Sequence, residues 1–357
     1  MVVRSRRTIG GAAAVALAVV AAVVGYTLVK SVPSSGSRAP APESATARAP
    51  APFRPAPAPS TTVDPATGPQ IPAHGAYIGA YAQPARYTVP EKIAAMHALQ
   101  DQAGGRLDIV HSYLRWEVPF PKPDQQAIMD QGSTLLLSWA GTDTRVIASG
   151  AEDGWIRRQA RAIKATGKPI FLEWRWEMNR PALHSQVHSP ADFVAAWDHI
   201  RSIFAKQHVR NVAWVWCPTA YGFGLDGASY YPGNSEVDWL CVDIYPRKGP
   251  HIPFAALAQP FLAWASHIRK PIMIGEYGVP RDYGPQPRAA WLRGAARVAR
   301  MDPQIKALVY FDGDSPFGDL WRRYGLDPGS APLLAFSRIA GQPYFDPDRL
   351  RVPGRSG

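Results

Sequence analysis

The sequence predicts an α/β fold, a (β/α)8 TIM barrel in which eight parallel strands alternate with helices. Apolar runs of strand length recur eight times over about 270 residues, with helical patterns between most of them. A doubly wound open sheet is the alternative. However, no Gly-x-Gly-x-x-Gly motif follows the first run, which favours the barrel.

The strands are expected at runs that are too short and too continuously apolar for exposed helices. In chain order these runs are Ala76–Ala82, Leu107–Tyr113, Thr134–Trp139, Pro169–Trp174, Val212–Trp216, Trp239–Ile244, Pro271–Gly275 and Ile305–Phe311.

The clearest helix is expected over Ser189–Phe204. Ser189 can cap it, Pro190 suits the first helical position, and Asp192 suits the first turn. Apolar residues then recur on one face at helical spacing. Other helices are expected over Pro90–Gln102, Glu152–Thr166, Pro253–His267 and Arg288–Met301.

The N-terminal segment has the pattern of an export signal. An almost unbroken apolar run covers residues 9–29 and follows three arginines, Arg4, Arg6 and Arg7. About 20 apolar residues are enough to span a bilayer, so residues 1–31 are expected to be a signal peptide or an uncleaved membrane anchor. The protein is therefore expected to be exported, either anchored at the outer face of the membrane or secreted.

Residues 32–73 are rich in Pro, Ala, Ser and Thr and contain few large apolar residues. Such a segment cannot bury a core, so a disordered linker is expected. It would lead into a barrel domain over residues 74–347, followed by a short tail over 348–357.

The net charge of +11 is distributed unevenly. Seven basic and two acidic residues precede residue 75, so the tail carries +5 and the remainder +6. The folded part has no dense Lys/Arg run, which disfavours nucleic-acid binding and leaves an anionic polysaccharide or envelope surface as a compatible partner.

The two cysteines, Cys217 and Cys241, fall in strands that would be neighbours in the barrel. A disulfide and a pair of buried thiols are both open interpretations. No Cys-x-x-Cys or His-Glu-x-x-His motif is present, so neither a metal nor an organic cofactor is predicted.

Two glutamates end apolar runs beside aromatic residues: Glu177 in the segment Pro169–Asn179 and Glu276 in the segment Lys270–Gly278. They belong to the fourth and seventh predicted strands, and the carboxyl ends of barrel strands carry the chemistry in this fold. Paired carboxylates are the equipment for cleaving a glycosidic bond, one as proton donor and the other as nucleophile or base.

Further site residues are expected around these carboxylates. Alternation places Glu173, Arg175 and Glu177 on one face, so Arg175 could pair with either glutamate, in a structural ion pair or in the site. Side chains near strand ends that could contact a sugar, with core packing as the alternative, are His111, Trp116, Trp139, Trp216 and Asp243.

Several motifs together resemble glycoside hydrolase family 26. They are Leu107–Tyr113, Trp174–Asn179, Asn211–Pro218, Tyr231–Gly233, Val237–Tyr245, Ile274–Gly278 and Leu308–Phe311. The resemblance implies that Glu177 is the acid/base, that Glu276 is the nucleophile, and that Tyr245 supports Glu276. The chain departs from the family pattern at two positions. Trp176 stands before Glu177, where many members have His, and Arg180 follows Glu-Met-Asn, where many members have Gly.

The resemblance implies a monomeric retaining endo-β-glycanase that hydrolyses mannan or β-glucan, with Trp176 among its substrate contacts. The alternatives are a glycanase or transglycosylase acting on the cell's own envelope or exopolysaccharide, and a non-catalytic carbohydrate-binding barrel. Because both carboxylates are present, the sequence favours an enzyme over a binding barrel.

Overall fold

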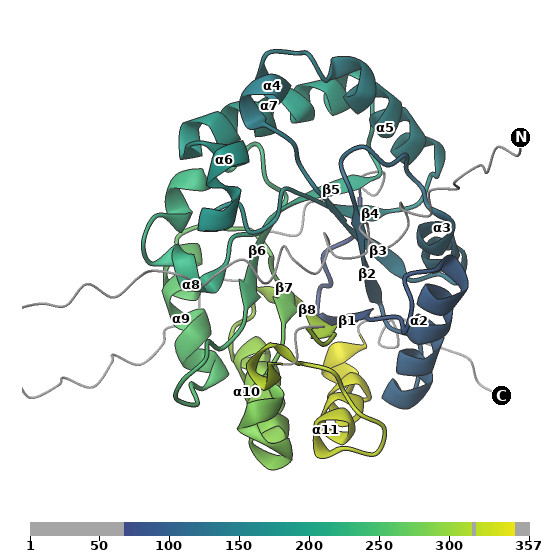
Figure 1. Cartoon of the computed structure of the whole chain (residues 1–357), viewed down its shortest axis with the longest axis vertical. Helices are drawn as coiled ribbons and strands as arrows, with labels where there is room; N and C mark the ends of the chain where they lie inside the picture. The colour runs from purple at the N-terminus through teal and green to yellow at the C-terminus, as the bar shows by residue number, and fades with distance from the viewer. Residues whose placement is uncertain (1–67, 316–318, 347–357) are drawn as a thin grey trace, which may run out of the picture. The chain divides into compact units, whose positions relative to one another are not determined.

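The computed structural model describes residues 68–315 and 319–346. Within these ranges eight parallel strands close into a barrel in chain order, with β1 paired to β8. Helices surround the strands (Figure 1). The predicted (β/α)8 barrel is confirmed. The predicted N-terminal apolar helix, most of the linker and the tail over 348–357 lie outside the described residues.

All eight predicted strands are present, three with the predicted boundaries and the others shifted by one or two residues. The strands are β1 (Tyr77–Ala82), β2 (Ile109–Leu114), β3 (Thr134–Trp139), β4 (Ile170–Trp174), β5 (Val212–Trp216), β6 (Trp239–Ile244), β7 (Ile272–Tyr277) and β8 (Ile305–Asp312). The shift at β7 matters for the site, because the strand runs past the predicted end at Gly275 and includes Glu276.

The five predicted helices are also present, as α2 (Val89–Ala103), α5 (Asp153–Ala165), α7 (Pro190–Lys206), α9 (Phe254–Ala265) and α10 (Pro285–Met301). The sequence interpretation missed α3 (Pro123–Asp130), α4 (Thr144–Ala148), α6 (His184–Val187), α8 (Ala220–Phe223) and α11 (Ala331–Ala340). Short 3-10 helices are η1 (Pro181–Leu183), η2 (Gly227–Tyr230), η3 (Arg281–Tyr283), η4 (Leu320–Arg322) and η5 (Pro343–Phe345).

Helix α7 begins as its sequence predicts. The hydroxyl of Ser189 accepts a hydrogen bond from the backbone N–H of Asp192 at 3.1 Å, and Pro190 occupies the first helical position. The buried face includes Phe193 and Trp197, which pack against Trp174 of β4. This packing holds the outer side of the strand that leads to Glu177.

Strand alternation divides the apolar residues into two clusters. The inner cluster fills the barrel and includes Leu136, Phe171, Trp239 and Met273. The outer cluster lies between strands and helices and is much larger. Since each strand supplies both clusters, the register of a residue decides whether it reaches the barrel interior.

Residues 68–72, at the end of the predicted linker, contact the N-terminal end of the barrel. The backbone N–H of Gly68 donates to the carbonyl of Arg210 at 2.8 Å, and the hydroxyl of Tyr77 donates to the carbonyl of Gln70 at 2.9 Å. Ile71 packs against the inner cluster. These residues cover the end of the barrel opposite the proposed chemistry.

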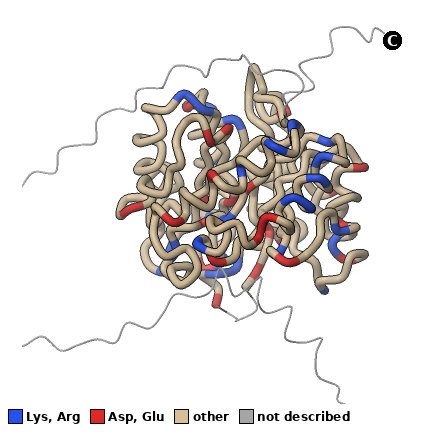
Figure 2. The backbone as a smooth tube through the Cα atoms, turned by 90° about the horizontal axis from the view of Figure 1, so that it is seen from above, with Lys and Arg blue, Asp and Glu red and all other residues tan. Residues whose placement is uncertain are grey.

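Within residues 68–315 and 319–346, no helix has both the length and the apolar character needed to cross a membrane. The predicted anchor over residues 1–31 lies outside these ranges. In Figure 2, Lys and Arg are interspersed with Asp and Glu along the described chain.

Candidate active site

Glu276 lies within β7, and two tyrosines hold its side chain inside the barrel mouth. The hydroxyl of Tyr113, on β2, donates to Oε1 at 2.6 Å, and the hydroxyl of Tyr245, directly after β6, donates to Oε2 at 2.7 Å. Only 2% of Glu276 is exposed. Both carboxylate oxygens are therefore fixed by neutral donors, one on β2 and one directly after β6.

The residue before Glu276 has to be glycine because of what lies behind it. A Cβ at Gly275 would lie 2.4 Å from the Sγ of Cys241 and 3.1 Å from both the Sγ of Cys217 and the Oδ1 of Asp243. Cys217 and Cys241 form a disulfide, which resolves the two interpretations left open by the sequence. The disulfide thus packs directly against the backbone that carries Glu276.

Glu177 lies three residues beyond the end of β4, in irregular backbone. Arg175 and Glu177 both have φ of 52°, a left-handed conformation that is uncommon for residues other than glycine. The backbone N–H of Glu177 donates to the carbonyl of Cys217 at 2.7 Å, which fixes this turn against the end of β5. The carboxylate of Glu177 pairs with the guanidinium of Arg180 at 2.8 Å.

Asn179 joins the same turn to the loop after β5. Its Oδ1 accepts from the backbone N–H of Thr219 at 2.9 Å, and its Nδ2 donates to the Thr219 carbonyl at 3.3 Å. A Cβ at Gly222 would lie 2.7 Å from this amide nitrogen. The Glu-Met-Asn segment therefore contributes a carboxylate to the mouth and an amide to the loop that supports it.

The charge of Glu177 affects the ionisation of Glu276. Burial raises the pKa of Glu276 to about 7, the negative charge of Glu177 adds to this, and the hydrogen bonds from Tyr113 and Tyr245 oppose it. Burial also raises the pKa of Glu177, and the charge of Arg180 opposes this rise. Two interacting carboxyl groups in one buried site favour a state in which they hold a single proton.

Two further acidic side chains lie deeper in the barrel. Glu173 and Asp243 are buried, and burial raises the pKa of each well above its usual value, with Glu276 and Glu177 contributing. Ser138 donates a hydrogen bond to Glu173. This environment favours the uncharged acid at both positions.

His111 lies beside this layer. Its Nε2 is hydrogen-bonded to Ser138 and lies 3.8 Å from Glu173, and burial lowers the pKa of His111 to about 3. The ring is therefore neutral at ordinary pH. Its Nδ1 has no hydrogen-bond partner among the described residues.

One group in the described part of the chain has metal-ligand chemistry. Glu173, Cys217, Cys241 and Asp243 each place a ligand atom within 4.8 Å of the others. Because the two sulfurs are bonded to each other, neither is available as a thiolate ligand. The oxidised pair thus serves here as packing beneath Glu276.

Three tryptophans that the sequence suggested as sugar contacts lie in the outer core. Trp139 and Trp216 are fully buried, and Trp116 stacks on Trp139 with ring centroids 4.5 Å apart. Trp139 and Trp216 face the helices rather than the barrel interior, and Trp116, which lies two residues beyond the end of β2, packs in the same outer cluster. With almost no surface to offer a sugar, these three residues are not included in the site proposed below.

Arg175 also lies elsewhere than the alternation argument suggested. Its guanidinium donates to the carbonyl of Gly141 at 3.1 Å and to the side chain of Gln186. The left-handed turn at Arg175 breaks strand alternation after Trp174, so the side chain leaves the face of Glu173. Arg180, a residue that the alternation pattern did not suggest, pairs with Glu177 instead.

The remaining suggested residues are near the two carboxylates. Tyr245 contacts Glu276, Asp243 and His111 lie beneath the pair, and Trp176 is partly exposed, with its ring 5.3 Å from that of Tyr113. Tyr113 was missed as a site residue. The signal that could have found it is its position two residues after His111, on the same strand face.

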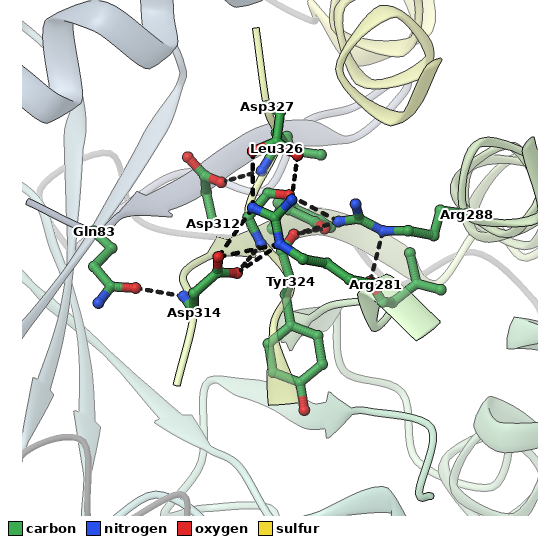
Figure 3. Close-up of polar contacts among 11 residues, drawn as sticks. Gln83, Arg281, Arg288, Asp312, Asp314, Tyr324, Leu326 and Asp327 are labelled. Carbon is green, nitrogen blue, oxygen red and sulfur yellow. Dashed lines mark hydrogen bonds and ion pairs between the residues drawn. The ribbon is translucent and has the colours of Figure 1, made fainter. Parts of the chain in front are cut away.

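Tyr324, also missed, comes from the loop after β8. Its ring lies 4.7 Å from that of Tyr245, and burial raises its pKa, with Glu177 and Glu276 contributing. Figure 3 shows its backbone within a polar network while its phenol points away from that network. Arg288 donates to the Tyr324 carbonyl at 2.8 Å.

The polar network around the Tyr324 backbone also holds the loop after β8 in place. Arg281, after β7, pairs with Asp314 at 2.9 Å and with Asp327, and Asp314 accepts from the backbone N–H of Gly325 at 2.8 Å (Figure 3). Asp312, at the end of β8, accepts from the backbone N–H of Leu326 at 2.7 Å. These contacts position Tyr324 beside Tyr245 at the barrel mouth.

Comparison with known sequences supports the resemblance that the motifs indicate. The chain is 31% identical over 240 residues to endoglucanase H of Acetivibrio thermocellus, a match covering 61% of this chain and 26% of that protein. It is 26% identical over 172 residues to the β-1,3-xylanase TXYA of a Vibrio species, covering 44% of this chain and 34% of that protein. The matched parts therefore span about a quarter to a third of these relatives. No protein-family model matches the chain.

Comparison with solved structures also finds a family 26 enzyme with a similar fold. The catalytic domain of a family 26 endo-β-1,4-mannanase from Bacillus sp. JAMB-750 is similar, with a TM-score of 0.59 and 15% identity, covering 76% of this chain and 87% of that one. The expected resemblance to glycoside hydrolase family 26 is confirmed in fold. At this identity the match informs the fold and not the substrate.

Proposed function

We propose that this protein is a retaining endo-β-glycanase of glycoside hydrolase family 26. The observation that carries the proposal is the pair of buried carboxylates, Glu177 and Glu276, which lie at the carboxyl ends of β4 and β7 of a closed barrel, with the charge of Glu177 raising the pKa of Glu276. The relatives, named an endoglucanase and a β-1,3-xylanase, and the mannanase neighbour support cleavage of β-linked glycans.

In the proposed first step, Glu276 attacks the anomeric carbon as its glycosidic C–O bond breaks. Tyr113 and Tyr245 orient the attacking carboxylate, and their raised pKa keeps both hydroxyls protonated as donors. Glu177 gives its proton to the departing oxygen. The products are a covalent glycosyl-enzyme and a free glycan end.

In the second step, Glu177 takes a proton from water, and the oxygen of that water attacks the anomeric carbon. The bond to Glu276 breaks and Glu276 leaves as a carboxylate. Two displacements at the same carbon give net retention of configuration. These steps use only side chains of this chain.

We also propose that the protein is exported and held at the outer face of the membrane. The apolar run over residues 9–29 and the disulfide between Cys217 and Cys241 support this location, because disulfides persist in oxidising compartments. A tethered enzyme acts close to its own cell. This favours, as a second candidate, remodelling of envelope polysaccharide or exopolysaccharide by hydrolysis or transglycosylation.

The test is a screen of the full-length protein against β-1,4-mannan, mixed-linkage β-glucan, β-1,4-glucan and β-1,3-xylan, with Glu276→Ala as the inactive control. The expected result is shorter oligosaccharides whose new reducing ends are first formed as β-anomers in the proton NMR spectrum. Initial formation of α-anomers would contradict retention. Oligosaccharides longer than the starting ones would favour transglycosylation.

A further inference from the structure

The loop after β5 exposes two large apolar side chains at the carboxyl end of the barrel strands. Tyr221, in α8, is 56% exposed, and Leu225, two residues after the end of this helix, is 82% exposed. Singly exposed apolar residues are ordinary on a protein surface. Two of them in one short loop, next to the turn that carries Glu177, indicate a surface that binds a ligand.

Helix α8 holds Tyr221 on a fixed support. Phe223 lies two residues later, so it points to the other side of the helix, where it is buried and packs edge-on against Trp216 and Phe261. The hydroxyl of Thr219 caps the helix by accepting a hydrogen bond at 3.1 Å from the backbone N–H three residues later. The exposed ring is therefore anchored by the buried side of its own helix.

This support also contacts the segment of the proposed acid. Asn179, two residues after Glu177, forms hydrogen bonds with both backbone groups of Thr219, the residue that caps α8. A Cβ at Gly222, next to Tyr221, would lie only 2.7 Å from the amide nitrogen of Asn179. The helix and the Glu177 turn are thus in close contact, which fixes the position of Tyr221 relative to this turn.

A second contact links the ring to the loop that supports Glu276. The guanidinium of Arg247 lies 3.9 Å from the ring centroid of Tyr221. Arg247 follows Tyr245, the donor to Glu276, by two residues. The guanidinium covers one face of the ring, while more than half of Tyr221 is still exposed. An aromatic ring that is held in this way loses little freedom when it binds a ligand.

We propose that Tyr221 is a stacking platform for a sugar in the departing part of the glycan. This inference rests on the proposed glycanase function. Glu177 gives its proton to the leaving oxygen, so the departing chain extends from the side of the site where the Glu177 turn contacts α8. The ligand is an uncharged pyranose ring, whose C–H groups pack on an aromatic face while its hydroxyls stay in water. Leu225, in the same loop, adds apolar surface.

The experiment compares the full-length parent with Tyr221→Ala, Tyr221→Phe and Met301→Ala. Met301, 59% exposed, ends α10 just before β8 and so lies at the opposite end of the barrel, which makes its truncation a matched loss of exposed apolar surface. The long substrates are hexasaccharides of β-1,4-mannan, β-1,4-glucan and β-1,3-xylan, labelled with oxygen-18 at the reducing end. The short substrates are the 4-nitrophenyl β-glycosides of the matching disaccharides, which contain no departing sugar.

Tyr221→Ala should lose roughly 5- to 30-fold in kcat/KM on the hexasaccharides relative to the nitrophenyl glycosides, the range for one aromatic contact in a binding site. Mass spectrometry of the fragments locates the cleaved bond. Because the reducing-end part departs, loss of its platform should move cleavage toward the reducing end, so that the labelled fragments become shorter. Tyr221→Phe keeps the ring and should restore the parental rates and fragments. Met301→Ala should not change either.

Equal losses on long and short substrates for Tyr221→Ala, an unchanged cleavage position, or a shift toward the non-reducing end would overturn the inference. The nitrophenyl glycosides and the melting temperature identify a variant that has failed to fold. In that case Tyr221→Leu, which keeps an apolar side chain without a ring, decides by the same two measurements. If the parent cleaves neither hexasaccharides nor aryl glycosides, the proposed function fails. If it cleaves them with a ratio and position independent of Tyr221, only this inference fails.

Discussion

The two carboxylates at the barrel mouth have opposite surroundings. Glu276 lies inside a regular strand and accepts hydrogen bonds from two neutral hydroxyls, one on each oxygen. Glu177 lies beyond a strand end, in left-handed backbone, and pairs with a cation. The first arrangement fixes a position, and the second controls a charge.

This difference matches the two tasks proposed for the pair. A nucleophile needs its attacking oxygen held in place and ionised, and the two hydroxyl donors serve both needs because they fix the carboxylate and lower its pKa. A proton carrier has to exist in two charge states during each turnover, so its surroundings have to allow both. The different surroundings therefore predict that replacing Glu276 and replacing Glu177 have different effects on activity.

The largest effect is expected from Glu276→Ala. Loss of the nucleophile should lower kcat by roughly 10⁴- to 10⁶-fold, on glycans and on activated aryl glycosides alike, because no covalent intermediate can form. Steady-state assays on both substrate types measure this. A variant that still cleaves glycan at the parental rate would show that Glu276 is not the nucleophile.

Glu177→Ala should separate the two substrate types. Proton donation contributes about 10²- to 10⁴-fold for a natural leaving group and little for an aryl group that leaves unaided. Glycan cleavage should therefore be lost while the activated aryl glycoside is still consumed. Added azide should accelerate that reaction and give a β-glycosyl azide, detectable by mass spectrometry. Parental rates on unactivated glycan would contradict the role of Glu177 as acid.

The burial of Glu276 should also be measurable as a cost in stability. Its pKa rises from the usual 4.5 to about 7, so between these values the folded protein holds a proton that the unfolded chain has lost. The free energy of unfolding then falls as pH rises through this window, by about 3 kcal/mol in total. The glutamine side chain in Glu276→Gln does not titrate in this range, so the variant lacks this pH-dependent loss of stability.

Denaturant titrations at pH 4.5 and pH 8 test this prediction. Glu276→Gln should gain up to about 3 kcal/mol relative to the parent between the two pH values. The exposed Glu117→Gln is the matched control and should show no such gain. A difference between parent and Glu276→Gln that is the same at both pH values would show that Glu276 titrates normally in the folded state.

The fold was predictable from sequence because parallel strands buried on both faces leave long apolar runs. Glu276 was suggested by its position at a strand end, and Tyr245 by the family resemblance. Side-chain register was the weak point. The tryptophans Trp139 and Trp216 were one residue away from facing the barrel interior, and the sequence gives no direct sign of which face of a doubly buried strand points inward.

Arg180 could not be predicted from strand periodicity for a different reason. The left-handed residues Arg175 and Glu177 redirect the chain after β4, and only tertiary contacts such as the Glu177–Cys217 backbone hydrogen bond stabilise that path. Alternation therefore assigned the cation to Arg175. Short helices such as α4 and α8 were missed because four or five residues contain too little periodicity to detect.

The smallest effect is expected from the two tyrosines, and it tests whether Glu276 is held as symmetrically as its contacts indicate. Tyr113→Phe and Tyr245→Phe each remove one hydroxyl from one oxygen of Glu276. A hydrogen bond to a charged group contributes about 1.5–3 kcal/mol, so each variant should lose roughly 10- to 100-fold in kcat/KM. Each hydroxyl also lowers the pKa of Glu276, so its removal should raise that pKa from about 7. Glu276 has to be ionised to attack, and the acidic limb of the pH–rate profile should therefore move to higher pH in both variants.

Tyr81→Phe is the control, because Tyr81 packs edge-on against Tyr113 and hydrogen-bonds to Tyr87. A shift in only one of the two variants would show that a single tyrosine orients the nucleophile, and a shift in Tyr81→Phe would show that the effect is not specific to the donors on Glu276.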